Sequence, residues 1–171
     1  MIIFRDDDVF CTESPTQGRV MHSMEKFIET HEILARRKKK HMLAIIANEI
    51  ENYPELVKYI LDRKEEFDFG VHGWAHHHYA NWDKEPIKRS LEMAKNKIEG
   101  TFGVTCEWFF PPWNERTPAM FEACAELGLK LNDSQVNTTA FLRGETNFDA
   151  ICFHFWSDGQ RGELARIVNS L

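Results

Sequence analysis

Two kinds of hydrophobic pattern alternate along the chain. Short continuous apolar runs are typical of buried strands, and stretches in which apolar residues recur every three or four positions are typical of amphipathic helices. The runs predict strands at residues 2–4, 42–47, 67–71, 107–110, 129–131 and 150–153. The helical stripes predict helices within residues 15–39, from Pro54 onward, over 83–100, over 117–128 and near 164–171. Residues 135–147 show no clear period, and we expect a loop there, with at most a short strand near Phe141.

Strands that alternate with helices along a whole chain predict an α/β fold, with a parallel sheet covered by helices. Such a sheet is either open and doubly wound or closed as a barrel. A chain of 171 residues with 43% hydrophobic content is long enough for one buried core and short for two. We therefore expect a single domain over residues 1–171.

Polar residues that can carry chemistry follow the predicted strands. They are the aspartates at 6–8, then His72, Asn114, Asp133 and His154. In both architectures, functional residues collect at the C-terminal ends of the strands. If the first and last strands pair, as in a barrel, the aspartates come close to His154.

The segment from Gly70 to His78 contains two histidines at metal-ligand spacing, His72 and His76. If the chain makes one helical turn after the strand, residues four apart point to the same side. Imidazole is a common ligand of zinc and related metals, but two imidazoles still need a carboxylate or thiolate from elsewhere. The alternative is a run of histidines on a surface loop with no function.

The aspartate triplet offers that carboxylate. Three consecutive aspartates repel one another, and at the end of a buried strand burial adds to the repulsion unless a cation is present. Asp7 with His72 and His76 would give a set of one carboxylate and two imidazoles with open positions, as catalytic metal sites have. The alternative is that the triplet caps the next segment or forms a solvated turn.

Charge and composition limit the partners. A formal net charge of −6 argues against a nucleic-acid or anionic membrane surface, and the basic run at residues 36–40 is typical of a solvated helix end. The N-terminus shows no signal-peptide pattern and no span approaches 18 apolar residues, so we expect a cytoplasmic location and no membrane partner. The four cysteines lack C-x-x-C spacing and are expected to be reduced core thiols.

Four motifs, each at a predicted strand end, resemble those of the polysaccharide deacetylase family, also described as the NodB-homology domain and carbohydrate esterase family 4. In this sequence they are Phe-Arg-Asp-Asp-Asp at 4–8, His-Gly-Trp-Ala-His at 72–76, Phe-Phe-Pro-Pro-Trp at 109–113 and Cys-Phe-His at 152–154. The resemblance spans nearly the whole chain. It implies a distorted (β/α) barrel of about six to seven parallel strands with helices outside.

The resemblance also implies an activity, which is metal-dependent hydrolysis of a non-peptide C–N bond that removes acetyl from an N-acetylated sugar. By position in the motifs, Asp7, His72 and His76 would hold one divalent metal, which we expect to be Zn²⁺, with Co²⁺, Ni²⁺ or Mn²⁺ as alternatives. Asp6 would be the general base and His154 the general acid. This chemistry suits the residues, because a metal with such ligands activates water and holds an oxyanion.

Other residues beside the motifs are expected to contact the substrate, because flat aromatic faces suit the apolar faces of sugar rings. They are Trp74, Pro112, Trp113, Asn114 and Trp156, although each tryptophan could equally be ordinary core packing. The expected substrate is a carbohydrate or a small amide. The acyl group, the metal and the oligomeric state are left open by the sequence.

The motifs also depart from the family pattern. The family usually has Thr-Phe-Asp-Asp-Gly in the first motif, so Arg5 and Asp8 are unexplained, and it usually has an arginine that orients the base where this chain has Phe110. Arg5 would be adjacent to Asp6, and adjacent side chains on a strand point to opposite faces. Two alternatives therefore stay open, which are a hydrolase of a small non-sugar amide and an inactive, metal-stabilised binding homologue.

Overall fold

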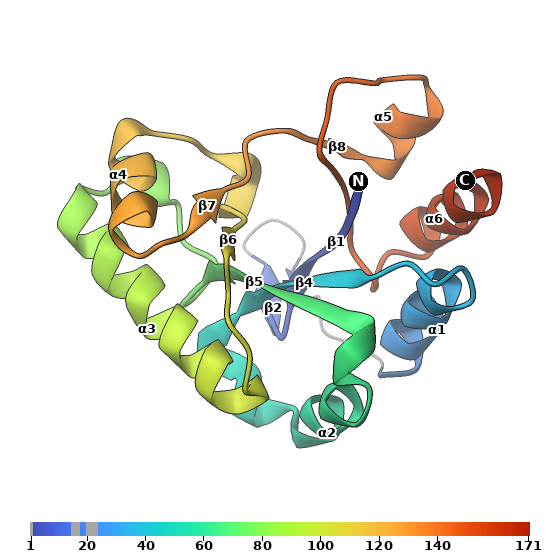
Figure 1. The fold of residues 1–171 in the computed structure, drawn as a ribbon, viewed down its shortest axis with the longest axis horizontal. Coiled ribbons are helices and arrows are strands. Elements are labelled where there is room, and N and C mark those ends of the chain that lie inside the picture. The colour runs from blue at the N-terminus through green and yellow to red at the C-terminus, as the bar shows by residue number, and fades with distance from the viewer. Residues whose placement is uncertain (1, 15–17, 20–23) are drawn as a thin grey trace.

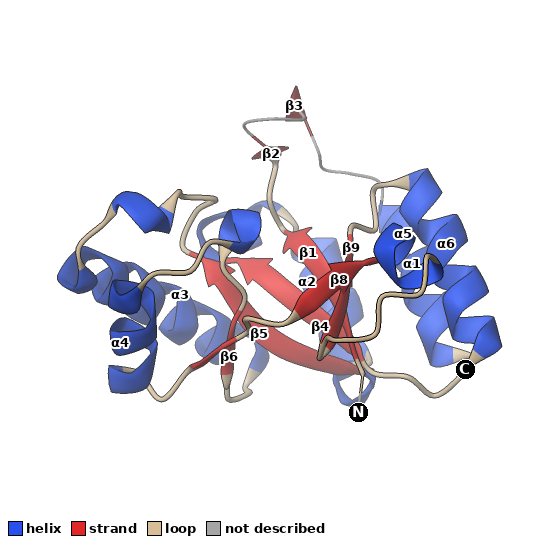
Figure 2. Cartoon of the chain, turned by 90° about the horizontal axis from the view of Figure 1, so that it is seen from above, coloured by secondary structure: helices blue, strands red, loops and turns tan. Residues whose placement is uncertain are grey.

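The computed structural model describes residues 2–14, 18–19 and 24–171. Seven parallel strands form one curled sheet in the order β7-β6-β5-β4-β1-β9-β8, which confirms the expected distorted barrel (Figure 2). The strands are β1 (Ile3–Val9), β4 (His41–Ile46), β5 (Phe67–Gly73), β6 (Trp108–Phe109), β7 (Lys130–Leu131), β8 (Gln135–Asn137) and β9 (Ala150–Phe153). The short strands β2 (Glu13–Ser14) and β3 (Gly18–Arg19) pair with each other, apart from this sheet.

Helices lie around the outside of the curled sheet, and α3, α2, α1 and α6 follow one another in an arc (Figure 1). The α-helices are α1 (Met24–Ala35), α2 (Pro54–Asp62), α3 (Lys84–Phe102), α4 (Pro118–Glu126), α5 (Thr138–Leu142) and α6 (Asp158–Ser170). Four short 3₁₀ segments complete the described elements: η1 (Ala47–Asn52), η2 (Lys64–Glu66), η3 (Tyr79–Asn81) and η4 (Pro112–Asn114). None of the helices in the described part of the chain has the length and hydropathy needed to cross a membrane.

The two faces of the sheet are buried in different ways. The outer face packs on the helices through two hydrophobic clusters. One includes Phe27, Leu43 and Ile45, and the other includes Phe4, Leu34 and Phe153. The concave face has a small cluster of Met42, Ala44 and Phe110. Side chains alternate between these faces along β1, so Phe4 and Asp6 point to the helices, while Arg5 and Asp7 point into the concave side.

The last strand pairs with the first, although the sheet is not closed. Strand β1 lies between β4 and β9, with Asp6 opposite Phe153, and the open edges are β7 and β8. The aspartates therefore lie near His154, as pairing of the first and last strands predicts. The first and last strands, which we expected to meet by barrel closure, pair instead in the middle of an open, curled sheet.

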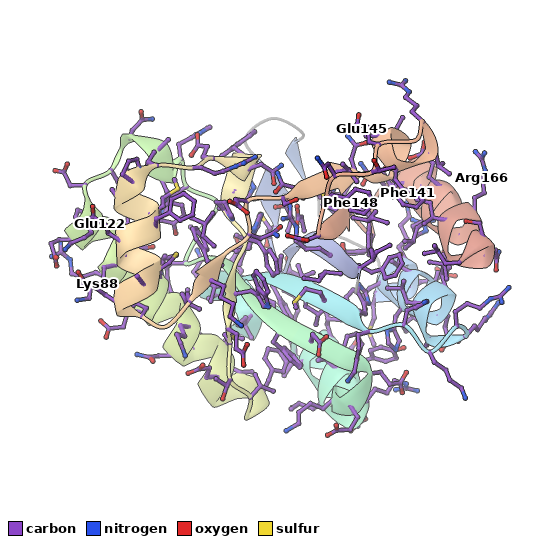
Figure 3. All side chains as sticks on the ribbon, turned by 45° about the horizontal axis from the view of Figure 1, so that its top comes forward. Lys88, Glu122, Phe141, Glu145, Phe148 and Arg166 are labelled. Atoms are coloured by element: carbon purple, nitrogen blue, oxygen red, sulfur yellow. The ribbon has the colours of Figure 1, made fainter. Side chains whose placement is uncertain are left out.

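Most predicted elements are present, and the differences are local. The prediction of a loop over residues 135–147 is wrong, because this segment forms β8 and α5, and Phe141 lies in the helix, where its ring contacts Phe148 (Figure 3). Helix α3 ends at Phe102 rather than near Gly100, and Gly103, which adopts φ 62°, caps it. Of the helical range expected at 15–39, residues 15–17 and 20–23 lie outside the described residues.

Candidate metal centre and active site

The aspartate triplet lies within β1, and its three side chains have three different partners. The pairing of β1 with β4 shifts register between Asp6 and Val9, and Asp8 adopts φ 62°. Aspartate tolerates this left-handed conformation better than most residues. The bend turns Asp8 away from the alternation of the strand and toward the end of β5.

Asp8 meets the two histidines of the motif. Its Oδ1 lies 3.2 Å from Nε2 of His72 and 3.0 Å from Nε2 of His76. One ligand atom from each of the three residues lies within 4.8 Å of the other two. Burial would raise the pKa of Asp8, but hydrogen bonds from both imidazoles outweigh it and hold that pKa below its usual range. Burial lowers the pKa of His72, but the hydrogen bond with Asp8 raises it overall.

The histidines converge by a route that the sequence did not predict. His72 is the penultimate residue of β5, and the chain bends after Gly73, at φ 132°, without forming a helical turn. A side chain at position 73 would lie 2.7 Å from the carbonyl oxygen of Ala75 and from the Tyr79 hydroxyl. Glycine is therefore required for the bend that returns His76 to His72.

The carboxylate with the histidines is Asp8, whereas the sequence analysis placed Asp7 there. The error is one residue of register, and it follows from the bulged end of β1, which a regular strand would not have. Asp7 instead accepts two hydrogen bonds from Arg5, with Nε to Oδ1 and Nη2 to Oδ2 both at 2.7 Å. Arg5 is two residues from Asp7 and on the same face of β1, so the alternation that separates Arg5 from Asp6 brings it to Asp7.

The structure places Asp6, the expected general base, where no substrate reaches it. Asp6 has no exposed surface, and its Oδ1 accepts a hydrogen bond from the backbone N–H of Phe155 at 2.9 Å. Its Oδ2 lies 3.1 Å from Nε2 of His41, which is also fully buried. Burial raises the pKa of Asp6 well above its usual value and lowers the pKa of His41 to about 3. The imidazole of His41 is therefore uncharged at neutral pH, and the hydrogen-bonded Asp6–His41 pair lies buried inside the helix-facing layer.

His154 approaches the cluster from β9. Its Nε2 lies 3.5 Å from Oδ2 of Asp8, and its side chain is 25% exposed. On the other side of the ring, Nδ1 donates to Oε1 of Gln160 at 3.1 Å, and the same oxygen accepts from the backbone N–H of His154 at 2.7 Å. Gln160 lies in the first turn of α6, which Ser157 caps. This bond fixes the ring and leaves Nε2 facing the cavity. The motifs gave no signal for Gln160.

One cavity of about 540 Å³ joins these groups. Asp7, Asp8, His72, His76 and His154 all line it, together with Gln160 and the β8–α5 segment. Of the expected substrate residues, Trp113 and Asn114 line the cavity, and Pro111 lines it in place of Pro112, which is buried. Trp74 and Trp156 are half-buried and pack against the hydrophobic core.

The two histidines that follow His76 lie apart from the metal cluster. His77 contacts the rings of Tyr79 and Trp82. His78 stacks on Trp113, with ring centroids 4.5 Å apart, and its Nδ1 lies 2.8 Å from Oε1 of Glu115. Both are therefore occupied with other contacts.

Phe110, at the position of the expected arginine, packs between Arg5 and Gly70. The guanidinium carbon of Arg5 lies 5.1 Å from the centroid of the Phe110 ring. On the other side, a Cβ at Gly70 would lie only 2.4 Å from an atom of that ring. The aromatic ring therefore occupies space that only a glycine on β5 leaves free. The carbonyl oxygen of Phe110 also accepts a hydrogen bond from Nδ1 of His72 at 2.6 Å.

Comparison with known proteins agrees with this fold. A family 4 carbohydrate esterase from Streptomyces lividans, in complex with acetate, aligns over 99% of this chain and 87% of its own, with a TM-score of 0.73 at 16% identity. The peptidoglycan deacetylase PdaC from Bacillus subtilis aligns over 100% and 82%, with a TM-score of 0.74 at 14% identity. A pseudoenzyme of carbohydrate esterase family 4 from Bacillus anthracis aligns over 99% and 59%, with a TM-score of 0.76 at 14% identity.

At these identities the structural likeness shows the fold alone, and no curated protein matches the chain in sequence. The family assignment comes from a sequence model. The model described as polysaccharide deacetylase matches residues 25–132, which is more than half of the chain. The chain therefore belongs to the polysaccharide deacetylase family.

Proposed function

We propose that this protein is a metal-dependent hydrolase that removes an acetyl group from an N-acetylated sugar. In this proposal, Asp8, His72 and His76 hold the metal, Asp7 is the general base and His154 is the general acid. One observation carries it, which is that a three-residue ligand cluster, a second carboxylate and a half-buried imidazole line the same cavity. The metal role moves from Asp7 to Asp8 and the base role from Asp6 to Asp7, relative to the sequence prediction.

The residues fit a divalent metal. Nδ1 of His72 donates to the carbonyl oxygen of Phe110, so its Nε2 is the nitrogen that offers a lone pair to the cluster. The carboxylate of Asp8 and Nε2 of His76 complete a set of donors typical of Zn²⁺ and related ions. A bound ion of this kind supplies a Lewis acid that polarises an amide carbonyl and acidifies water. The donor set is compatible with zinc, cobalt, nickel or manganese.

Asp7 is suited to accept a proton from water. It is next to Asp8 in the chain and lines the cavity, yet it is not one of the three residues of the ligand cluster found among the described residues. Arg5 takes one lone pair from each of its oxygens. A carboxylate offers about four lone-pair sites, so acceptor capacity remains on Asp7.

His154 is suited to give a proton to the leaving amine. It is the most exposed of the three imidazoles around Asp8, with side-chain exposures of 25% against 10% for His76 and 3% for His72. Gln160 accepts the Nδ1 hydrogen, so Nε2, the nitrogen directed to the cavity, is the one that can gain a proton and give it up. An amide nitrogen leaves poorly without protonation, which gives this imidazole its role.

A sugar is the favoured substrate because of the family and of the cavity. The family model and the likeness to an esterase with bound acetate and to a peptidoglycan deacetylase support an acetylated carbohydrate. The cavity volume of about 540 Å³ is in the range for small ligands, and Trp113 lies at its wall with an aromatic surface. A small non-sugar amide would fit the same volume and is the competing substrate class.

The competing hypothesis is that the protein is an inactive homologue that binds metal, and two observations support it. A pseudoenzyme from Bacillus anthracis has the same fold as this chain, and Phe110 replaces the expected arginine. Both hypotheses predict metal binding. They differ in whether the protein turns over an N-acetyl group.

The test combines metal analysis with acetate release from N-acetylated sugars, on the wild type, Asp8→Asn and His154→Ala. We expect about one divalent ion per wild-type chain, retention of that ion by His154→Ala and its loss from Asp8→Asn. We expect acetate from the wild type alone at full rate, with His154→Ala about 10²–10⁴-fold slower. A wild type that holds metal and releases acetate from no N-acetyl sugar or amide would establish the inactive homologue.

A further inference from the structure

Arg5 is a fully buried cation, and its shortest side-chain hydrogen bonds are to the carboxylate of Asp7. It has no exposed surface, and it does not line the cavity. Two of its nitrogens hold both oxygens of Asp7 at 2.7 Å. This side-by-side arrangement fixes the plane of the carboxylate as well as its position, which a single hydrogen bond does not do.

The guanidinium itself is held from three other directions. Nη1 donates to Oδ1 of Asn132 at 2.9 Å, and Nη2 donates to Oδ1 of Asn114 at 3.0 Å. The ring of Phe110 lies against it at 5.1 Å. These residues come from the strand ends and loops beyond β6 and β7, so several distant segments set the place of one side chain.

Stability alone is a weak explanation for such an arrangement. Removing two charges from water costs about as much as their attraction returns, so a buried ion pair stabilises a fold little compared with apolar packing. Here the pair lies at the wall of the cavity, one residue from the ligand Asp8. The Arg5–Asp7 pair is therefore costly to bury, and it lies where the orientation of the Asp7 carboxylate decides how that group meets a water molecule.

We infer that Arg5 is a positioning residue for the general base, and that it orients Asp7 from two positions earlier on the same strand while Phe110 supports its guanidinium. This inference rests on the proposed function, since it assigns Asp7 as the base. It explains how the chain keeps an oriented carboxylate without an arginine at position 110. Phe110 also suits this position, because a second guanidinium at position 110 would repel that of Arg5.

The experiment measures kcat, KM and metal content for Arg5→Lys, Arg5→Gln and the double variant Arg5→Gln/Phe110→Arg. Lysine keeps the charge but lacks the planar fork. We expect both single variants to lower kcat about 10²-fold, the effect of a misplaced catalytic group, with KM and metal content unchanged. The double variant returns a guanidinium from the end of β6, and we expect it to recover at least tenfold of that loss.

A matched control separates orientation from loss of stability. Ile98→Ala removes buried side-chain volume from α3 and lowers the melting temperature without touching the cavity, and we expect its kcat to be unchanged. If Arg5→Gln does not fold, Arg5→Lys still tests the inference, since it retains the buried charge. An Arg5→Lys protein with wild-type kcat, beside an inactive Asp7→Asn, would overturn the inference and leave the proposed function intact. If Asp7→Asn is as active as the wild type, the proposed function itself fails.

Discussion

On the concave face of β1, Arg5 and Asp7 form an ion pair at the wall of the cavity, whereas on the face toward the helices Asp6 and His41 form a hydrogen-bonded pair with no exposed surface. The aspartates are adjacent in sequence and both are buried. What separates them is the partner, because a guanidinium is permanently charged, while burial lowers the pKa of His41 to about 3 and leaves its imidazole uncharged. The same residue type is therefore available for chemistry on one face and serves the fold on the other.

The largest expected effect contrasts Asp7→Asn with Asp6→Asn. Asp7→Asn should lower kcat by about 10²–10⁴-fold while the metal stays bound, because an amide does not accept the proton of water. Asn at position 6 still accepts from the Phe155 N–H and donates to His41, so Asp6→Asn should retain activity within a few-fold. Acetate release and metal analysis on both variants check this. Equal losses in the two variants would mean that the faces are wrongly assigned.

The next prediction tests the uncharged state of buried His41 by its dependence on pH. The pKa of His41 is lowered from 6.5 to about 3 by burial, so its contribution to stability is present above pH 6.5 and is lost as the pH falls toward 3. The free energy of unfolding of the wild type should fall relative to that of His41→Gln over this range. The difference should reach several kcal/mol, at about 1.4 kcal/mol per pKa unit.

Denaturant titrations of the metal-free proteins at several pH values between 7.5 and 4 measure this difference, and chelation removes metal binding from the comparison. Asp6 is present in both proteins, so its own titration largely cancels. A wild type that gains stability relative to His41→Gln as the pH falls would mean that His41 is charged in the fold.

A smaller effect is expected at Gln160, whose neutral amide accepts a hydrogen bond from His154, the proposed general acid. Gln160→Ala should lower kcat about 10-fold, less than the loss of proton transfer itself, because His154 remains but its ring is free to turn. Gln160→Glu keeps an acceptor oxygen and should retain more activity than Gln160→Ala. Equal activity of the two variants would show that the hydrogen bond to Nδ1 has no part in the reaction.

The smallest effect is expected at the histidines outside the metal cluster. His77→Ala and His78→Ala should leave the metal content unchanged, because both rings face other partners. His76→Ala, measured alongside by the same metal analysis, should lose the ion. Loss of metal from His78→Ala would show that the ligand pair is wrongly chosen.

The sequence predicted the sheet and helices well because the apolar runs are continuous and the helical stripes are long. It missed β8 and α5, which have three and five residues, because such short elements contain less than two periods of any pattern. It also placed the histidine pair on a helical turn, whereas the bend depends on one backbone angle at Gly73.

The aspartate register could not be predicted from residue types alone, because it depends on the positive φ of Asp8 and on the bulge that follows Asp6. One signal was present. Arg5 and Asp7 are two apart on a strand and share a face, which assigns the guanidinium to Asp7 and leaves Asp8 for the histidines. Gln160 has no such signal in the sequence, because it lies in helix α6, six residues after His154 and outside the motif.

The contact between Gly70 and Phe110 limits the order in which this site can change during evolution. A Cβ at position 70 would overlap the Phe110 ring, and displacing that ring would disturb its contact with the guanidinium of Arg5, which holds Asp7. A lineage that carries an aromatic residue at 110 therefore cannot exchange Gly70 first without disturbing Asp7. Position 110 has to change before position 70 is released, so substitutions at the two sites are epistatic and ordered.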